Sequence, residues 1–148
     1  MNDILNTAAK VQDAADKFTT IADEMKTKRR KAFDEGKITA DEVMQNVSEE
    51  TMLRELATKL YVKSNDYVVA GAQASQMELN KAIADAKEKI AEIAQFKRAV
   101  NIFVSVIGLA GSILSGQPLA IVGAISGVKE AVKGGEEKDV PVQKKAGK

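Results

Sequence analysis

The residues that decide the fold run from Ala99 to Val128 and read AVNIFVSVIGLAGSILSGQPLAIVGAISGV. None of them is charged, although Asp, Glu, Lys and Arg make up 29% of the chain. The stretch divides into two apolar arms on either side of Ser115-Gly116-Gln117-Pro118. Because glycine readily ends a helix and proline cannot continue one, the pattern predicts two helices joined by a turn. A helix that is apolar on all sides is either buried in protein or in contact with lipid.

The composition around this stretch favours an all-α fold. The chain has 148 residues and a net charge of +1, only 4% of its residues are aromatic, and it contains no Cys and no His. Ala, Leu, Ile and Val supply most of its apolar content, together with many Lys and Glu. We expect one domain over residues 1–133, formed as an elongated helical bundle or coiled coil. The apolar helical hairpin, residues 99–132, lies at its C-terminal end.

Apolar residues at helical spacing predict two helices before the hairpin. The first covers roughly residues 3–35: a seam from Ile4 to Met25 forms its inner face, and Gly36 follows its end. The second covers roughly residues 39–63 and begins at a capping box, Thr39 to Glu42. A break is expected at Ser64-Asn65-Asp66, because these side chains compete for backbone hydrogen bonds.

From there the helical pattern continues without interruption into the first apolar arm. It predicts a third helix over roughly residues 66–114, which would be ~75 Å long at ~1.5 Å per residue. The second arm predicts a fourth helix over roughly residues 119–133. Residues 134–148 carry Gly, Lys and Pro and almost no large apolar side chain, so we expect a disordered tail.

The residue types needed for the commonest catalytic chemistry are missing. Without His or Cys the chain lacks the usual general base and the usual zinc ligands. No phosphate-binding glycine motif is present either, so we expect no enzyme activity, no cofactor, no metal site and no small-molecule substrate. The near-neutral charge predicts no nucleic-acid binding. Glu49, Glu50 and Glu55 are interpreted as a solvated helix face, and the basic run Lys26–Lys31 as the cationic C-terminal end of the first helix.

Two features of the hairpin are typical of contact with lipid. Basic residues precede and follow the uncharged stretch, and both ends of a hairpin reach the same surface, so these residues are expected to face headgroups together. Small residues recur every four positions, which lets helices approach closely in lipid or in an oligomer. The basic residues are Lys97, Arg98, Lys129 and Lys133, and the small ones are Gly108, Ser112 and Gly116 in one row and Gly123 and Gly127 in another.

The length of the arms points the other way. About 20 apolar residues are needed to cross ~30 Å of hydrocarbon, and each arm is shorter than that. In the competing interpretation, the arms are the central helices of a water-soluble bundle, wrapped by the apolar faces of the first two helices. The two interpretations are compatible if the hairpin is covered in the monomer and released at a membrane.

From about Asn65 to Lys133 the chain resembles the α-helical pore-forming toxins of the cytolysin A and haemolysin BL group. The resemblance rests on long heptad-patterned helices that end in an uncharged, glycine-rich hairpin with basic flanks. The hairpins of pore-forming colicins are more loosely similar. In those families the monomer is soluble and the hairpin enters the membrane. The resemblance implies that the inserting residues here are Val100, Ile102, Phe103, Val104, Val106, Ile107, Leu109, Ile113 and Leu114 on the first arm, and Leu119, Ile121, Val122, Ile125 and Val128 on the second.

The sequence thus predicts a membrane-active helical protein that docks or inserts its hairpin into a bilayer as an oligomer, in the manner of a pore-forming component. The alternative is a soluble, non-enzymatic interaction or scaffold protein whose hairpin is the bundle core or a homo-oligomer interface. The expected partners are lipid, a second copy or another helical protein. The first ten residues lack the regions of a signal peptide. This predicts a protein that is cytoplasmic as synthesised and either associates with membranes or is exported by a signal-independent route.

Overall fold

The structure is a computed structural model that describes residues 4–67 and 74–138, with side chains up to Gly134. The regular structure of these residues is entirely α-helical, which confirms the all-α prediction. The helices are α1 (Ala8–Asp34), α2 (Ala40–Lys63), α3 (Gln76–Glu92), α4 (Phe96–Ser115) and α5 (Pro118–Lys138).

The first helix begins later than the sequence pattern predicts. Its N-cap is Thr7, whose side chain accepts a hydrogen bond from the backbone N–H of Lys10. Ile4 and Leu5 instead form a turn and are buried. The Leu5 N–H donates to Gln76 Oε1 at 2.7 Å, which ties the start of the chain to the start of α3. Residues 1–3, where the predicted helix starts, lie outside the described residues.

The second helix begins at the capping box expected from the sequence. The Thr39 hydroxyl accepts from the Glu42 N–H at 3.1 Å, and Glu42 Oε1 accepts from the Thr39 N–H at 2.8 Å. Two otherwise unpaired N–H groups of the first turn are thereby satisfied. The helix ends at Lys63, and Ser64 begins the turn that follows.

The prediction of one long third helix is wrong, because this part of the chain forms two helices. α3 ends at Glu92, Ile93 is extended with φ −70° and ψ 135°, and α4 begins only at Phe96. The chain turns back within three residues, so the apolar faces of α3 and α4 pack against each other and no ~75 Å rod forms. The part of the prediction over residues 68–73 lies outside the described residues.

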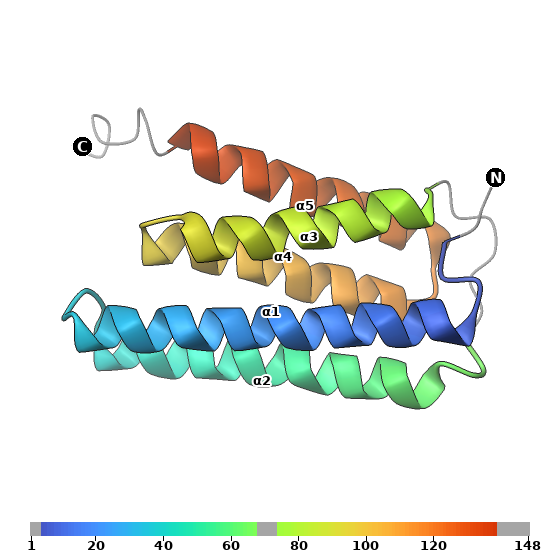
Figure 1. Ribbon diagram of the computed structural model, residues 1–148, viewed down its shortest axis with the longest axis horizontal. Helices are drawn as coiled ribbons and strands as arrows, with labels where there is room; N and C mark the ends of the chain where they lie inside the picture. The colour runs from blue at the N-terminus through green and yellow to red at the C-terminus, as the bar shows by residue number, and fades with distance from the viewer. Residues whose placement is uncertain (1–3, 68–73, 139–148) are drawn as a thin grey trace.

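The five helices lie side by side along the long axis of the molecule, and successive helices run in opposite directions (Figure 1). α4 occupies the centre, because it packs against α1, α2, α3 and α5. Among the described residues, α5 packs mainly against α3 and α4. The predicted cover over the first apolar arm therefore consists of three helices, α1, α2 and α3.

The turn between α4 and α5 follows from its glycine and proline. Gly116 ends α4 in the left-handed conformation with φ 73°, which only glycine adopts without strain. Pro118 is the first residue of α5, where its missing N–H costs no hydrogen bond. α5 continues to Lys138, so residues 134–138 are helical where a disordered tail was expected. The rest of that tail, residues 139–148, lies outside the described residues.

Candidate functional site

Most of the large apolar side chains predicted to enter lipid form the core of the bundle. This burial follows from the central position of α4, whose inner face meets three helices besides α5. The residues that are buried are Ile102, Phe103, Val106, Leu109 and Ile113 on α4, and Ile121, Ile125 and Val128 on α5. Val100, Ile107, Leu114 and Val122 are partly buried. Only two of the predicted residues are exposed, Val104 and Leu119.

Between Arg98 and Lys129, the outward surface of α4 and α5 carries no charge and most of its exposed side chains are small. The sequence contains no charged residue between Arg98 and Lys129, so this whole section of the surface is uncharged. At its turn end, Leu119 has 84% of its surface exposed. Val104, on α4, is also exposed. This surface is the part of the predicted site that a partner reaches while the bundle stays folded.

The glycines of this surface do not mediate close helix packing within the chain. A Cβ atom added at Gly108, Gly123 or Gly127 would meet nothing within 4 Å. α4 and α5 therefore pack against each other through other residues. The close helix packing expected at these three glycines does not occur within the monomer. Gly116 serves a different purpose, as the left-handed cap of α4. Close packing of the glycines against a second molecule stays a prediction.

The basic residues that flank the uncharged stretch do not lie at one level. At ~1.5 Å per residue, Lys129 lies roughly 16 Å along α5 from Pro118, whereas Lys97 lies roughly 28 Å along α4 from Gly116. Lys129 is exposed and 4.0 Å from Glu78 of α3. Lys97 and Lys133 are exposed as well.

Arg98 departs from the prediction that it faces headgroups. Only 7% of its surface is exposed, and its Nε donates to Gln95 Oε1 at 2.9 Å. It lies on the inward side of α4, next to the buried Ala99.

α4 is the one helix among the described residues that is long and apolar enough to cross a bilayer. It reaches 20 residues because it begins at Phe96, before the uncharged stretch. The central helix of a water-soluble bundle meets the same criterion, and 44% of the apolar window is buried inside the protein. Length and composition alone therefore do not decide between lipid and core.

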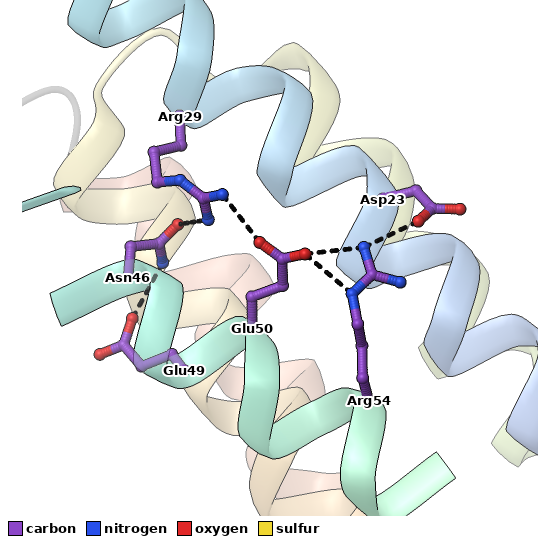
Figure 2. A network of polar contacts seen from close by, with 6 residues as sticks. All are labelled: Asp23, Arg29, Asn46, Glu49, Glu50 and Arg54. Carbon is purple, nitrogen blue, oxygen red and sulfur yellow. Dashed lines mark hydrogen bonds and ion pairs between the residues drawn. The ribbon is translucent and has the colours of Figure 1, made fainter. Parts of the chain in front are cut away.

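A polar network between α1 and α2 overturns the interpretation of Glu50 as a solvated residue (Figure 2). Glu50 is 8% exposed, and its carboxylate lies 2.8 Å from Arg29 of α1 and 2.8 Å from Arg54. Arg54 also pairs with Asp23 of α1 at 2.9 Å. Arg29, although part of the basic run, is itself buried. Sequence patterns do not reveal this network, because its partners lie on different helices.

The charges of the network keep Glu50 ionised. Burial alone raises the pKa of this carboxyl, but hydrogen bonds from Arg54 and Arg29 and their positive charges outweigh it, so the pKa lies below its usual value. Asn46 completes the arrangement: its Oδ1 accepts from Arg29 and its Nδ2 donates to Glu49. Glu49 is half-buried, while Glu55 is exposed as predicted. The paired charges fix α1 against α2, and we assign them a structural role.

A cleft of about 680 Å³ opens at the end of the bundle where the α1–α2 and α3–α4 turns lie. Its charged lining consists of Lys28, Lys31, Lys37, Lys97, Glu35, Glu42 and Glu92. Burial and the neighbouring Lys31 lower the pKa of Lys28, whose Nζ lies 3.4 Å from the Ala91 carbonyl oxygen. Four lysines and three glutamates line the cleft, so its charge is nearly balanced and selects no single class of ligand.

Within the part of the chain that the structure describes, no group of three or more acidic side chains is placed to hold a metal ion. The surface of α4 and α5 is thus the candidate functional site with the most distinctive composition. Comparison of the chain with protein-family models, with curated proteins and with solved structures gave no match.

Proposed function

We propose that this protein is a non-enzymatic helical protein that associates with lipid bilayers through the uncharged surface of α4 and α5. One observation supports this above all: the surface lacks charge from Arg98 to Lys129 and ends in Leu119, which is 84% exposed. Helices on the surface of soluble proteins normally carry charged residues on their outer face. An uncharged outer face with an exposed Leu at its tip is suited to an apolar partner.

The position of Lys129 favours docking over spanning. The uncharged part of α5 is roughly 16 Å long, which is about half of the ~30 Å hydrocarbon thickness of a bilayer. A lysine at the bilayer centre is costly. Entry from the turn end is therefore limited to one leaflet, and the bundle associates as a peripheral protein. A pore-forming step would require α4 and α5 to separate from α1, α2 and α3.

A second candidate function is a soluble helical interaction or scaffold protein in which α4 serves only as the core. The observation that favours it is the complete burial of Ile102, Phe103 and Val106 among the other helices. In that case the outer surface of α4 and α5 binds a protein helix or a second copy of the chain. The two candidates differ in one measurable property, which is binding to pure lipid.

Flotation of the full chain with phosphatidylcholine vesicles, with and without phosphatidylglycerol, tests the proposal. The wild-type protein should float with the vesicles. The paired variant Ala120→Glu/Gly123→Glu adds charge to the exposed start of α5 without touching the core. It should lose at least about tenfold in partitioning, because each carboxylate would have to leave water.

The matched control is Ser48→Glu/Thr51→Glu, which adds the same charge to exposed positions of α2. It should partition within about twofold of the wild type. Helical circular dichroism must be unchanged in both variants. If the wild-type chain stays in the aqueous fraction with every lipid composition, the membrane function is wrong and the soluble interaction protein takes its place.

A further inference from the structure

One end of the bundle gathers the most exposed large apolar side chains among the described residues. Leu119 is 84% exposed, Val62 is 78% exposed and Met77 is 77% exposed. They belong to three different helices: Val62 lies in the last turn of α2, Met77 in the first turn of α3 and Leu119 in the first turn of α5. Figure 1 shows these three helix ends at the same end of the bundle.

Hydrogen bonds between elements hold this end together. Gln12 Nε2 of α1 donates to Ser64 Oγ, just after α2, at 2.9 Å. Tyr67 follows α2 in the chain, and its hydroxyl donates to the Ile113 carbonyl oxygen near the end of α4. Together with the bond between Leu5 and Gln76, these contacts link the starts of α1 and α3 to the ends of α2 and α4. These bonds fix the ends of α2 and α3, which carry Val62 and Met77, and Leu119 follows the end of α4 after the short turn at Gly116.

Two lysines near this end are free to contact an anionic surface. Lys59 and Lys63, in the last two turns of α2, are exposed, and neither has an ion-pair partner within the described part of the chain. Two exposed acids lie nearby: Asp66 in the following turn and Glu78 beside Met77, and Glu78 is 4.0 Å from Lys129. Lysines beside apolar side chains are the combination that binds peripheral proteins to acidic lipids.

We infer that the bundle docks on the membrane end-on, an inference that rests on the proposed membrane function. Val62, Met77 and Leu119 enter the headgroup region together, and Lys59 and Lys63 contact anionic headgroups. The docking surface then extends beyond the α4–α5 pair to the ends of α2 and α3. The helix axes stand steeply to the membrane plane, and the cleft beside the α1–α2 turn faces away from the lipid.

Because the chain contains no Trp, single Trp reporters can map which residues meet lipid. Three variants, Val62→Trp, Met77→Trp and Leu119→Trp, place the reporter at the proposed surface. Phe33→Trp and Met44→Trp are matched controls, because these residues are also exposed and lie at the opposite end of the bundle. The probe is a vesicle of phosphatidylcholine with phosphatidylglycerol. We expect a blue shift of emission in all three end reporters and none in the two controls.

The lysines are tested by a second pair of variants. Lys59→Gln/Lys63→Gln should reduce partitioning into vesicles that contain phosphatidylglycerol by about tenfold. Lys26→Gln/Lys31→Gln removes the same charge from exposed positions toward the other end of α1 and should have at most about a twofold effect.

The outcomes separate this inference from the proposed function. If the wild-type chain floats and Leu119→Trp alone shifts, α4 and α5 dock without α2 and α3, and the end-on arrangement is wrong while the membrane function stands. A shift in the controls as large as that in the end reporters also overturns it. If the end reporters shift without lipid as protein concentration rises, the surface binds a second copy instead. If the chain does not float at all, both proposals fail.

Discussion

At the scale of single residues, the glycines of α4 and α5 stand out, because they weaken the helices and gain no packing within the chain. A glycine inside a helix costs about 1 kcal/mol relative to alanine. A Cβ at Gly108 or Gly123 would meet open space. We predict that Gly108→Ala and Gly123→Ala each raise the free energy of unfolding by ~0.5–1 kcal/mol, measured by thermal or urea denaturation.

Gly116→Ala is the control for this prediction. Its φ of 73° is a left-handed conformation, which costs a residue with a Cβ roughly 1 kcal/mol or more. This variant should therefore lower the melting temperature. A loss of stability in Gly108→Ala or Gly123→Ala would show instead that these glycines have a neighbour in solution, such as a second copy of the chain.

Glu50 makes stability depend on pH in the acidic range. Its pKa is held below the usual value of 4.5 in the folded state, because burial, which raises it, is outweighed by hydrogen bonds from Arg54 and Arg29. The native state therefore binds this proton more weakly than the unfolded state does, and the stabilisation is complete above about pH 4.5. It is lost as the pH falls through the lowered pKa. We predict that Glu50→Gln destabilises the protein by on the order of 3 kcal/mol at neutral pH.

The measurement is urea denaturation of both proteins from neutral pH down to pH ~3. The difference in free energy of unfolding between the wild type and Glu50→Gln should decrease on acidification, because protonation of Glu50 removes the same charge as the substitution. Glu55→Gln is the control, because Glu55 is exposed on the same helix. A gap that stays constant with pH would mean that the network acts through packing rather than charge.

At the scale of the helices, the sequence predicts a helix boundary where a capping residue marks it. α2 begins at a visible capping box, Thr39 to Glu42. The start of α3 has the same signal, Ser75 to Glu78, which the prediction of one long helix overlooked. The start of α4 has none, because Gln95 makes no side-chain cap hydrogen bond. Apolar residues recur at helical spacing on both sides of this break, so their spacing does not mark it, although Val104 falls on the exposed side of α4.

The same contrast applies to the candidate site. The uncharged surface and the turn at Gly116 follow from composition and from glycine and proline. The sequence does not show which side chains of α4 and α5 face outward, because a helix that is apolar on most sides has no periodic apolar pattern. The position of α4 among four neighbours settles it. The pairing of Glu50 with Arg29 is equally invisible in the sequence, because it joins two helices.

Tyr67 connects the segment after α2 to the end of α4, and its removal should be measurable. Its hydroxyl donates to the Ile113 carbonyl oxygen near the end of α4, which also accepts from the Gly116 N–H at 3.0 Å. We predict that Tyr67→Phe lowers the free energy of unfolding by ~1 kcal/mol. Burial raises the pKa of Tyr67 from 10.0 to about 12. The folded state thus holds this proton more tightly than the unfolded state.

The pH dependence of this variant provides an internal check. The contribution of Tyr67 is complete below pH 10 and is lost as the pH rises toward 12. The deficit of Tyr67→Phe relative to the wild type, measured by urea denaturation, should therefore shrink over that range. A deficit that grows would contradict a buried, protonated hydroxyl. Tyr61→Phe, at an exposed position of α2, is the control and should have little effect.

At the scale of the whole molecule, the central position of α4 sets the cost of any insertion that opens the bundle. Its five large buried side chains, Ile102, Phe103, Val106, Leu109 and Ile113, each contribute about 1.5–3 kcal/mol by burial. Their sum is comparable with the total stability of a typical domain, about 5–15 kcal/mol. Lipid would bury the α4 side chains again, but the apolar faces of α1, α2 and α3 that pack against α4 would be exposed to water. Extraction of α4 into lipid therefore unfolds the rest of the bundle. The exposed end and the uncharged outer surface of α4 and α5 can meet a membrane without such a separation.

We accordingly predict that the wild-type protein binds vesicles that contain phosphatidylglycerol and leaves them sealed, because a bundle docked to the depth of one leaflet does not cross the hydrocarbon. The measurement is release of an encapsulated dye at protein concentrations where flotation shows binding. Variants in which the bundle is destabilised should be compared with the wild type in the same assay. If the covering helices hold α4 in place, Leu53→Ala, which removes a buried α2 side chain at a cost of about 2–5 kcal/mol, should increase release, whereas Met52→Ala at the exposed neighbouring position should not. Release by the wild type at neutral pH would contradict one-leaflet docking and would mean that lipid itself separates α4 from α1, α2 and α3.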